Sequence, residues 1–322
     1  MSEMPKVVVV MAAYNRETLI HMGIQSFLRQ GYLNKELLIC DDCSTDNTWQ
    51  IISDYAAKYP EIKIFRNAVN IGFIKTINWL FSIAEGDFIS ICDSDDWMAD
   101  NKLQHQYDLL NRYKADCVIS EYMGVRSDGT QKAFELRHKE PTILQLDKHD
   151  VYFPAGSLFT KAEVIKKLNG FNEYFADAFC GDIYLFHLIA ERYNILYDPA
   201  HIYYYRLHPD SMTQSFDLKK LVKLALVLEL VKERSITGSD MLERGQYDLL
   251  EEKGKQILQN KKWLSRQYRL YAARYVDEKK FIDAKQFIRK AIFLNPLSFL
   301  NYRTLFYFFR KRMHIHSANA VA

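Results

Sequence analysis

The feature that most constrains the fold is an unbroken apolar run near the N-terminus, Val7-Val8-Val9-Val10-Met11. A strand with one face in water alternates apolar and polar residues, whereas this run is apolar throughout and mostly β-branched. It therefore predicts a strand buried on both faces, as in a parallel sheet. Three further short runs and three stretches of helical spacing follow, the runs at residues 36–40, 62–65 and 87–92 and the helices at 17–30, 45–58 and 74–84. Alternating strands and helices predict an α/β fold, with a mostly parallel sheet and helices on both faces.

Polar side chains follow each of the four predicted strands: Tyr14 and Asn15, then Asp41 and Asp42, then Asn70, then Asp93 and Asp95. Ligands of parallel sheets bind beyond the carboxyl ends of the strands, so we expect these side chains to converge on one site. Each cluster alone is equally typical of a turn or a cap, and Ser44 or Thr45 is a candidate N-cap for the next helix. Four clusters at four strand ends favour a binding site.

The last cluster, Asp93-Ser94-Asp95-Asp96, places three carboxylates within four positions. Like charges this close repel one another, so a cation is expected among them. An all-oxygen cluster suits Mg²⁺ or Mn²⁺. In an extended segment Asp93 and Asp95 would point the same way and share one target. Acidic runs of this length are also common in surface turns.

Other nucleotide and metal motifs are absent from the sequence. It contains no Gly-x-Gly-x-x-Gly and no Gly-x-x-x-x-Gly-Lys-Ser/Thr pattern, so phosphates would be held by a metal rather than by a glycine-rich loop. Cys40 and Cys43 form a C-x-x-C pair, but a structural zinc site needs a second pair. A thioredoxin-like redox site is also a poor fit, because the acidic residues between the two thiols oppose thiolate formation. Cys40 is therefore expected to be a buried strand residue.

Composition points to a folded protein in the cytoplasm. The 322 residues are 48% hydrophobic and 26% charged, which is typical of a globular chain with two domains or one domain and an appendage. No apolar run approaches the roughly eighteen residues of a membrane span, and the first residues do not resemble a signal peptide. The odd number of cysteines, five, indicates reduced thiols and a cytoplasmic location.

The ordered set of motifs resembles the family 2 glycosyltransferases with the GT-A fold, over about residues 5–215. The motifs that carry this resemblance are Val7 to Asn15, Asp41-Asp42-x-Ser44-x-Asp46, Asn70-x-Gly72-Phe73 and Asp93-x-Asp95-Asp96. The resemblance implies a metal-dependent, inverting enzyme that uses a nucleotide-activated sugar. It implies that residues 1–100 form the nucleotide-sugar half of the domain and residues 101–216 the acceptor half.

The resemblance also assigns roles to residues of the nucleotide half. Ala13 and Tyr14 would line the nucleobase pocket, and Asp41 would accept a hydrogen bond from a uracil-type base. Asp93 would lie near the ribose and diphosphate, with Ser94 and Asn70 beside the donor. Asp95 would hold the Mn²⁺ or Mg²⁺ that bridges the diphosphate. Lys75 is a candidate positive charge near the phosphates, because Ile77 stands where many members of the family have arginine.

Two residues of the second half match the family's acceptor and metal motifs. Asp182, in Cys180-Gly181-Asp182-Ile183, matches the general base, and a base is required because a sugar hydroxyl is a poor nucleophile. Gly181 replaces the glutamate that usually precedes this base, and Asp182 could equally be a helix N-cap. His208, in a Tyr-Arg-x-His segment, would be a further metal ligand or diphosphate contact.

Residues 217–322 are predicted to be a helical, basic appendage. They carry 22 Lys and Arg against 11 Asp and Glu, whereas residues 1–216 carry 21 against 29. Residues 272–296 resemble one tetratricopeptide-type repeat. Such a repeat is not stable by itself and needs about two neighbouring repeats, so we expect this one to pack on the rest of the protein. Basic and aromatic residues are interleaved over 261–313, which fits peripheral contact with an anionic membrane. The alternative is a helix pair with a core of aromatics and solvated lysines, and nucleic acid is not expected as a partner.

We therefore expect a cytoplasmic glycosyltransferase of the hexosyltransferase class, which moves a sugar from a UDP-sugar to a saccharide acceptor, lipid-linked, in surface polysaccharide biosynthesis. The alternatives are a sugar nucleotidyltransferase and a non-catalytic sugar-nucleotide-binding module. A nucleotidyltransferase would usually carry a glycine-rich loop after its first strand, and residues 12–16 are not one. The joint presence of four candidate site residues disfavours a module that has lost its catalytic activity: Asp93, Asp95, Asp182 and His208.

Overall fold

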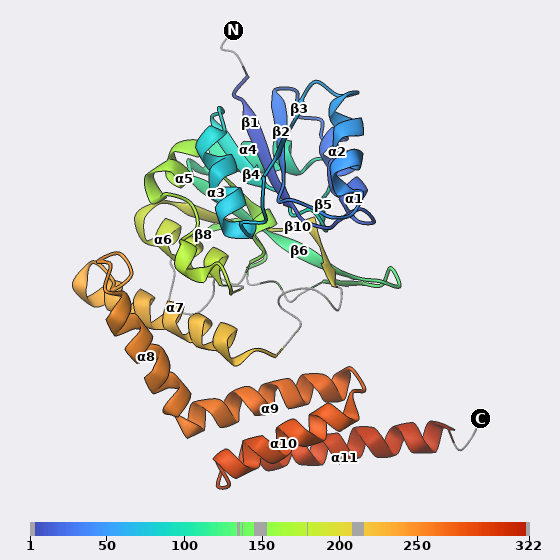
Figure 1. Ribbon diagram of the computed structural model, residues 1–322, viewed down its shortest axis with the longest axis vertical. Helices are drawn as coiled ribbons and strands as arrows, with labels where there is room; N and C mark the ends of the chain where they lie inside the picture. Colours follow the sequence, from blue (N-terminus) through green and yellow to red (C-terminus); the bar gives the residue numbers. More distant parts are fainter. Residues whose placement is uncertain are drawn as a thin grey trace. The chain divides into compact units, whose positions relative to one another are not determined.

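The computed structural model describes residues 4–133, 136, 138–144, 153–178, 180–207 and 216–319. The chain divides into two compact units, Met1–Ser215 and Phe216–Ala322, here called the sheet unit and the helical unit (Figure 1). His208 lies outside the described residues.

The sheet unit is built on one mixed sheet, with strand order β3-β2-β1-β4-β9-β6-β10-β5 and with β7 and β8 paired to β6 and β10. The strands are β1 Val7–Ala13, β2 Lys35–Asp41, β3 Ile62–Arg66, β4 Phe88–Ile91, β5 Trp97–Met98, β6 Cys117–Arg126, β7 Gln131–Ala133, β8 Thr142–Ile143, β9 Leu158–Lys161 and β10 Ile195–Leu207. The first four strands are parallel, and β9 is antiparallel to both of its neighbours, β4 and β6. The parallel pair of β6 and β10 then continues the sheet.

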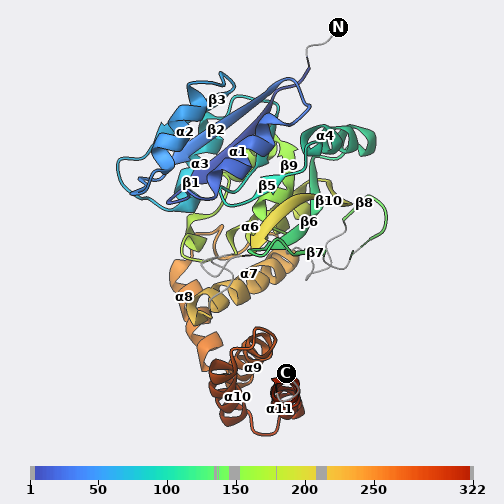
Figure 2. The ribbon, with the colours of Figure 1, turned by 90° about the vertical axis from the view of Figure 1, so that its right-hand side faces the viewer.

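Helices cover the two faces of this sheet, as the alternating pattern predicts. Figure 1 shows α3 on one side of β1 and β2 and α1 and α2 on the other, and Figure 2 looks onto that second side. The helices are α1 Ile20–Leu28, α2 Thr48–Ala56, α3 Phe73–Ile83, α4 Lys102–Tyr113, α5 Ala162–Leu168 and α6 Gly181–Arg192, with short 3₁₀ turns at Ala155–Ser157 and Glu173–Phe175. All seven residues of β1 are buried, and Cys40 is fully buried in β2, which confirms both predictions. The expected α/β fold with a mostly parallel sheet is confirmed.

The predicted N-cap of the second helix is wrong. Helix α2 begins at Thr48, whose backbone N–H donates to the Asp46 carboxylate at 3.0 Å. Ser44 instead accepts a hydrogen bond from the Asn15 backbone N–H at 2.9 Å. The loops after β1 and β2 are thereby tied together, because Ser44 satisfies a backbone donor of the neighbouring loop rather than one of its own helix.

The described part of the helical unit contains five helices, which agrees with the helical spacing of its sequence. They are α7 Leu218–Thr237, α8 Tyr247–Gln259, α9 Lys261–Asp277, α10 Phe281–Leu294 and α11 Phe299–Asn319. The last three share a small core of Ala272, Val276, Ala284, Ile288 and Phe308. Among the helices described in either unit, none combines the length and the apolar character needed to cross a membrane.

Candidate functional site

A cavity of about 720 Å³ opens in the sheet unit where the first strands end. Polar lining comes from the loops after β1, β2, β3 and β4, from the start of α6 and from the end of β10. A largely aromatic wall comes mostly from the second half of the unit. The lining residues include Ala13, Tyr14, Arg16, Asp42, Asn70, Phe73, Asp93, Ser94, Asp95, Tyr122, Phe153, Phe171, Asp182, Tyr205 and Arg206. The structure thus brings together the polar clusters of the strand ends, as the parallel sheet predicts.

The acidic segment after β4 is a turn rather than an extended strand, so the geometric reason given for the Asp-x-Asp spacing is wrong. The backbone N–H of Asp96 donates to the carbonyl oxygen of Asp93 at 3.1 Å and closes the turn. Asp93 and Asp95 still both line the cavity, whereas Asp96 is only 1% exposed. The three carboxylates therefore separate into two that face the cavity and one that anchors the turn.

Two residues of β10, more than 100 residues away in the sequence, hold the turn in place. The hydroxyl of Tyr203 donates to the Asp96 carboxylate at 2.8 Å and accepts a hydrogen bond from the Asp93 backbone N–H at 3.2 Å. Arg206 donates from its backbone N–H to Asp96 at 2.7 Å and from Nε to the carbonyl oxygen of Asp95 at 2.9 Å. Its guanidinium also lies over the Trp97 ring, 5.0 Å from the ring centroid. These contacts fix the direction in which Asp93 and Asp95 point.

Burial and mutual repulsion raise the pKa values of the acids around this turn. Burial, followed by the charges of Asp95 and Asp182, raises the pKa of Asp93 to about 7. Burial and the charges of Asp95 and Asp93 hold the pKa of Asp96 well above its usual range. The Arg16 guanidinium lies beside Asp95, with Nη2 3.5 Å from Oδ2. A cation would relieve this repulsion, so the donor set fits a hard divalent ion.

Protein ligands alone do not complete such a metal site among the described residues. These contain no group of three or more His, Cys, Asp or Glu side chains arranged to hold a metal. Mg²⁺ and related ions are commonly bound by one or two carboxylates together with substrate phosphates and water. The arrangement of Asp93 and Asp95 therefore suits an ion that arrives with a diphosphate.

Asp182 faces the cavity from the start of α6. The helix begins at Gly181 with Cys180 as its N-cap, so Asp182 lies in the first turn and not at the cap. One carboxylate oxygen accepts from the Ile183 backbone N–H at 2.8 Å, while burial raises the pKa of Asp182 to about 7. A β-carbon on Gly181 would lie 3.0 Å from Cδ1 of Ile74, so a larger residue there would require the Ile74 side chain to shift.

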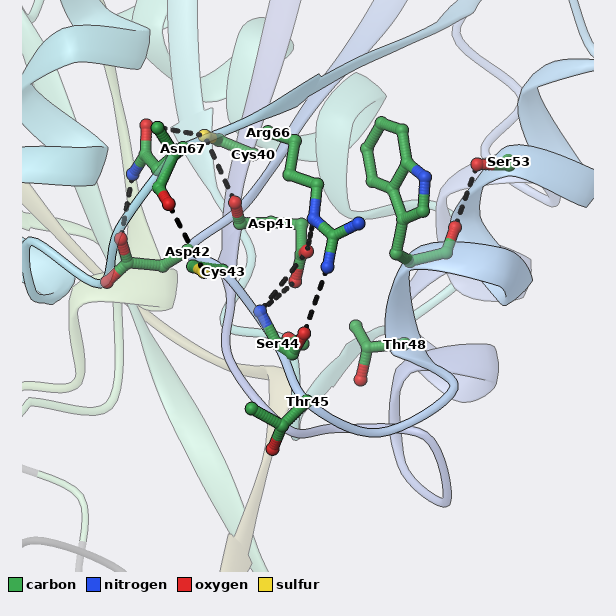
Figure 3. A network of polar contacts seen from close by, with 12 residues as sticks. Cys40, Asp41, Asp42, Cys43, Ser44, Thr45, Thr48, Ser53, Arg66 and Asn67 are labelled. Atoms are coloured by element: carbon green, nitrogen blue, oxygen red, sulfur yellow. Dashed lines mark hydrogen bonds and ion pairs between the residues drawn. The ribbon is translucent and has the colours of Figure 1, made fainter.

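Asp41, the last residue of β2, and Asp42, which follows it, have different surroundings (Figure 3). The Asp41 carboxylate is fully buried, lies 3.0 Å from Nε of Arg66 and accepts from the Ser44 backbone N–H. Asp42 accepts from Asn67 at 2.7 Å and from the Gly72 backbone N–H at 2.8 Å. Only Asp42 of the two lines the cavity. The nucleobase role assigned to Asp41 stays a prediction.

Of the remaining predicted site residues, four line the cavity and one does not. Ala13, Tyr14, Asn70 and Ser94 line the cavity, and Tyr14 is 42% exposed. Lys75 is not among the lining residues, and its Nζ lies 3.9 Å from the Glu173 carboxylate.

Sequence reasoning missed both arginines of the cavity and its aromatic wall. Arg16 directly follows the Tyr14-Asn15 cluster, and Arg206 lies in the Tyr-Arg-x-His segment, so each adjoined a motif that was recognised. The aromatic wall is made by Phe73, Tyr122, Phe153, Phe171 and Tyr205. Phe73 and Tyr205 each belong to a motif that was recognised, whereas Tyr122, Phe153 and Phe171 come from distant segments that no local spacing connects.

Comparisons with known proteins indicate a family. A family model described as Glycosyl transferase family 2 matches residues 8–169. The "Putative glycosyltransferase EpsE" of Bacillus subtilis (strain 168) is 34% identical over 174 residues, which are 53% of this chain and 62% of that protein. The "UDP-Glc:alpha-D-GlcNAc-diphosphoundecaprenol beta-1,3-glucosyltransferase WfaP" of Escherichia coli is 35% identical over 119 residues, which are 37% of this chain and 47% of that protein. The chain thus spans less than two thirds of either curated relative.

A solved structure supports the fold over a larger part of the chain. The crystal structure of residues 1–349 of S. aureus TarS in complex with UDP superposes with a TM-score of 0.60, at 18% identity. The superposition covers 90% of this chain and 88% of that chain. At this identity the likeness concerns the fold.

Proposed function

The chain belongs to glycosyl transferase family 2, and we propose that it transfers a sugar from a UDP-sugar to a saccharide acceptor with inversion at the anomeric carbon. One observation carries the proposal: Asp93 and Asp95 line the same cavity as Asp182, whose pKa burial raises to about 7. A group that binds a metal diphosphate and a group that accepts a proton are the two parts that such a transfer needs.

The donor would occupy the part of the cavity formed by the strand ends. Ala13 and Tyr14 would bind the nucleobase, Asp41 would accept its hydrogen bond, and Asp93, with Ser94 and Asn70, would lie beside the ribose and diphosphate. The relative from Escherichia coli is named for UDP-Glc, and the S. aureus structure contains UDP, which supports a uridine nucleotide.

A Mn²⁺ or Mg²⁺ ion would be held by Asp95, with Asp93 beside it and His208 as a further ligand. When bound, such an ion offsets the charge that develops on a leaving diphosphate. Arg16 already lies beside Asp95, so its guanidinium is close enough to share this task once an ion occupies the carboxylates. Lys75 is a second candidate charge for the phosphates.

Asp182 would remove the proton from the acceptor hydroxyl. A base acts best when its pKa is close to the working pH, and the pKa of about 7 meets this condition near neutrality. A single displacement, with the base and the leaving diphosphate on opposite sides of the sugar, inverts the anomeric carbon. An α-linked UDP-sugar would therefore yield a β-linkage.

The acceptor would lie against the aromatic wall, where rings can pack on the apolar faces of a sugar. We propose a lipid-linked saccharide in surface polysaccharide biosynthesis, because the WfaP relative is named for a diphosphoundecaprenol-linked acceptor. The protein would then work in the cytoplasm at the inner face of the membrane, with its basic helical unit in contact with anionic lipid.

The decisive experiment screens UDP- and GDP-sugars for hydrolysis with and without Mn²⁺, and then for transfer to lipid-linked saccharides. Metal-dependent turnover of a UDP-sugar, followed by transfer, is the expected result. Pyrophosphate release from a nucleoside triphosphate and a sugar phosphate would instead identify a nucleotidyltransferase. Tight UDP binding without turnover on any acceptor would identify a binding module.

A further inference from the structure

An exposed aromatic stripe runs along α11. Phe299, Tyr302, Phe306, Phe309 and Met313 are 75%, 45%, 68%, 51% and 64% exposed, respectively. Their spacing of three, four, three and four residues places them on one side of a helix, over a length of about 20 Å. Scattered exposed apolar residues are ordinary, but a continuous row of this kind marks a surface that contacts something else.

The opposite face of α11 is already packed on the rest of the helical unit. Phe308 is 2% exposed and belongs to the core shared with α9 and α10, and Asn301 is 1% exposed. The Asn301 amide donates to Ser265 Oγ at 3.0 Å and to the Ala291 carbonyl oxygen at 2.9 Å. The buried face thus fixes the rotation of the helix about its axis, so the stripe is held facing outward.

Charge indicates what this surface contacts. Arg303, Arg310, Lys311 and Arg312 are exposed on the same helix, and no Asp or Glu follows Asp283 in the sequence. Arg266 and Arg269 add basic charge on the neighbouring helix α9, and burial together with the charges of Arg266 and Arg303 lowers the pKa of Arg269. Two copies of α11 packed through the stripe would bring these cations together without an acidic partner on either helix, whereas an anionic surface would neutralise them.

We propose that α11 lies in the interface of an anionic membrane, with the aromatic stripe among the headgroups and acyl boundary and the flanking Arg303 and Arg310 on lipid phosphates. Basic residues beside a row of large apolar side chains are the arrangement of helices that bind in this plane. The inference rests on the membrane contact proposed above and assigns that contact to one helix face.

The test measures co-sedimentation of the full chain with phosphatidylcholine vesicles that contain phosphatidylglycerol or lack it. The double variant Phe306→Ser/Phe309→Ser removes two rings of the stripe without changing charge, and should bind anionic vesicles about tenfold more weakly or worse. Ile236→Ser/Ile282→Ser removes two apolar side chains that are 74% and 78% exposed on α7 and α10, and should bind like the wild type. Arg303→Glu/Arg310→Glu should weaken binding most at low salt.

A second variant keeps the test valid if the serine substitutions disturb folding. Phe306→Trp preserves the apolar surface, and brominated acyl chains should quench its fluorescence beyond the quenching of the wild-type tryptophans. The inference is overturned if the wild type ignores anionic vesicles at low salt, if the serine and control variants bind equally, or if the introduced tryptophan is not quenched. A dimer that dissociates in the Phe306→Ser/Phe309→Ser variant would assign the stripe to a second copy and also overturn it.

Hydrolysis of the UDP-sugar without vesicles separates this inference from the proposed function. The stripe variant should retain that hydrolysis, because none of the described residues of α11 lines the cavity. A wild type that binds vesicles without hydrolysing any donor would contradict the proposed function alone. A wild type that hydrolyses the donor and ignores vesicles would contradict the inference alone.

Discussion

A β-carbon on Gly156 would lie 2.0 Å from Cζ of Tyr203, so the phenol ring rests directly on the Gly156 backbone. This close approach lets the Tyr203 hydroxyl reach both the Asp93 backbone N–H and the Asp96 carboxylate. Gly156 belongs to the short 3₁₀ turn before β9, and Tyr203 to β10. The second half of the sheet unit therefore positions the acidic turn that ends β4.

Gly156→Ala should destabilise the protein and loosen the acidic turn together. The added methyl group overlaps the Tyr203 ring, and overpacking of this kind costs about 1–3 kcal/mol or more of unfolding free energy. Chemical denaturation measures this loss, and calorimetry should show weaker Mn²⁺-dependent UDP binding. Gly31→Ala is the matched control, because a β-carbon there meets no atom within 4 Å. Equal stability of the two variants would contradict the packing role of Gly156.

Asp95→Ala should abolish Mn²⁺-dependent binding of UDP. The substitution removes the carboxylate proposed as the metal ligand, and the diphosphate then has no bridging cation. Calorimetric titration with UDP, with and without Mn²⁺, measures the effect. Asp100→Asn serves as the control, because Asp100 is largely exposed and pairs with Arg29. Unchanged affinity in Asp95→Ala would remove this residue from the metal site.

Divalent metal should stabilise the protein more at pH 8 than at pH 5.5. The pKa of Asp93 is raised to about 7 in the folded protein, from an ordinary value of 3.8. The folded state therefore binds more protons than the unfolded state between about pH 4 and 7, and the contribution of Asp93 to stability falls as pH rises through that window. Above pH 7 the ionised carboxylate carries its full penalty, and a bound cation relieves it.

Thermal melting with and without Mn²⁺ at the two pH values measures this difference. A shift of several degrees at pH 8, with a smaller one at pH 5.5, is expected. Asp93→Asn should raise the melting temperature of the metal-free protein at pH 8 and reduce the effect of the metal. An equal metal effect at both pH values would mean that the ion binds away from these acids.

Much of this site could be anticipated because parallel strands place their carboxyl ends at one edge. The all-apolar run of β1 predicts a strand buried on both faces, and the polar residues after β1, β3 and β4 then meet in space. The same logic could not separate Asp41 from Asp42. Which neighbour faces the cavity depends on how the loop leaves β2, and the Arg66 contact that buries Asp41 comes from another strand.

Contacts between segments far apart in the sequence could not be predicted from local sequence patterns. Tyr203 is 110 residues from Asp93, and nothing in either local pattern indicates that the two meet. The turn at Asp93–Asp96 could not be distinguished from an extended segment, because that choice is made by the contacts to β10. In α11 apolar residues occur on both faces, so the sequence predicts a helix without showing which face is core.

Asp182→Asn should lower kcat by about 10²–10⁴ while the affinity for the UDP-sugar holds. The substitution preserves size and removes the proton acceptor, whereas the proposed nucleobase contacts and the aspartates proposed for the metal lie at the ends of the first four strands. In the wild type, kcat measured at saturating Mn²⁺ and UDP-sugar should rise with pH and level off above about pH 7, because Asp182 must be ionised to act as a base and burial raises its pKa to about 7. Asp182→Asn should lose that rise, which distinguishes proton transfer from a purely structural role.

Asp198→Asn alters another buried carboxylate of the sheet unit, one that does not line the cavity, and should retain the wild-type pH profile. Near-normal transfer by Asp182→Asn, or a product that retains the donor's anomeric configuration, would end this assignment.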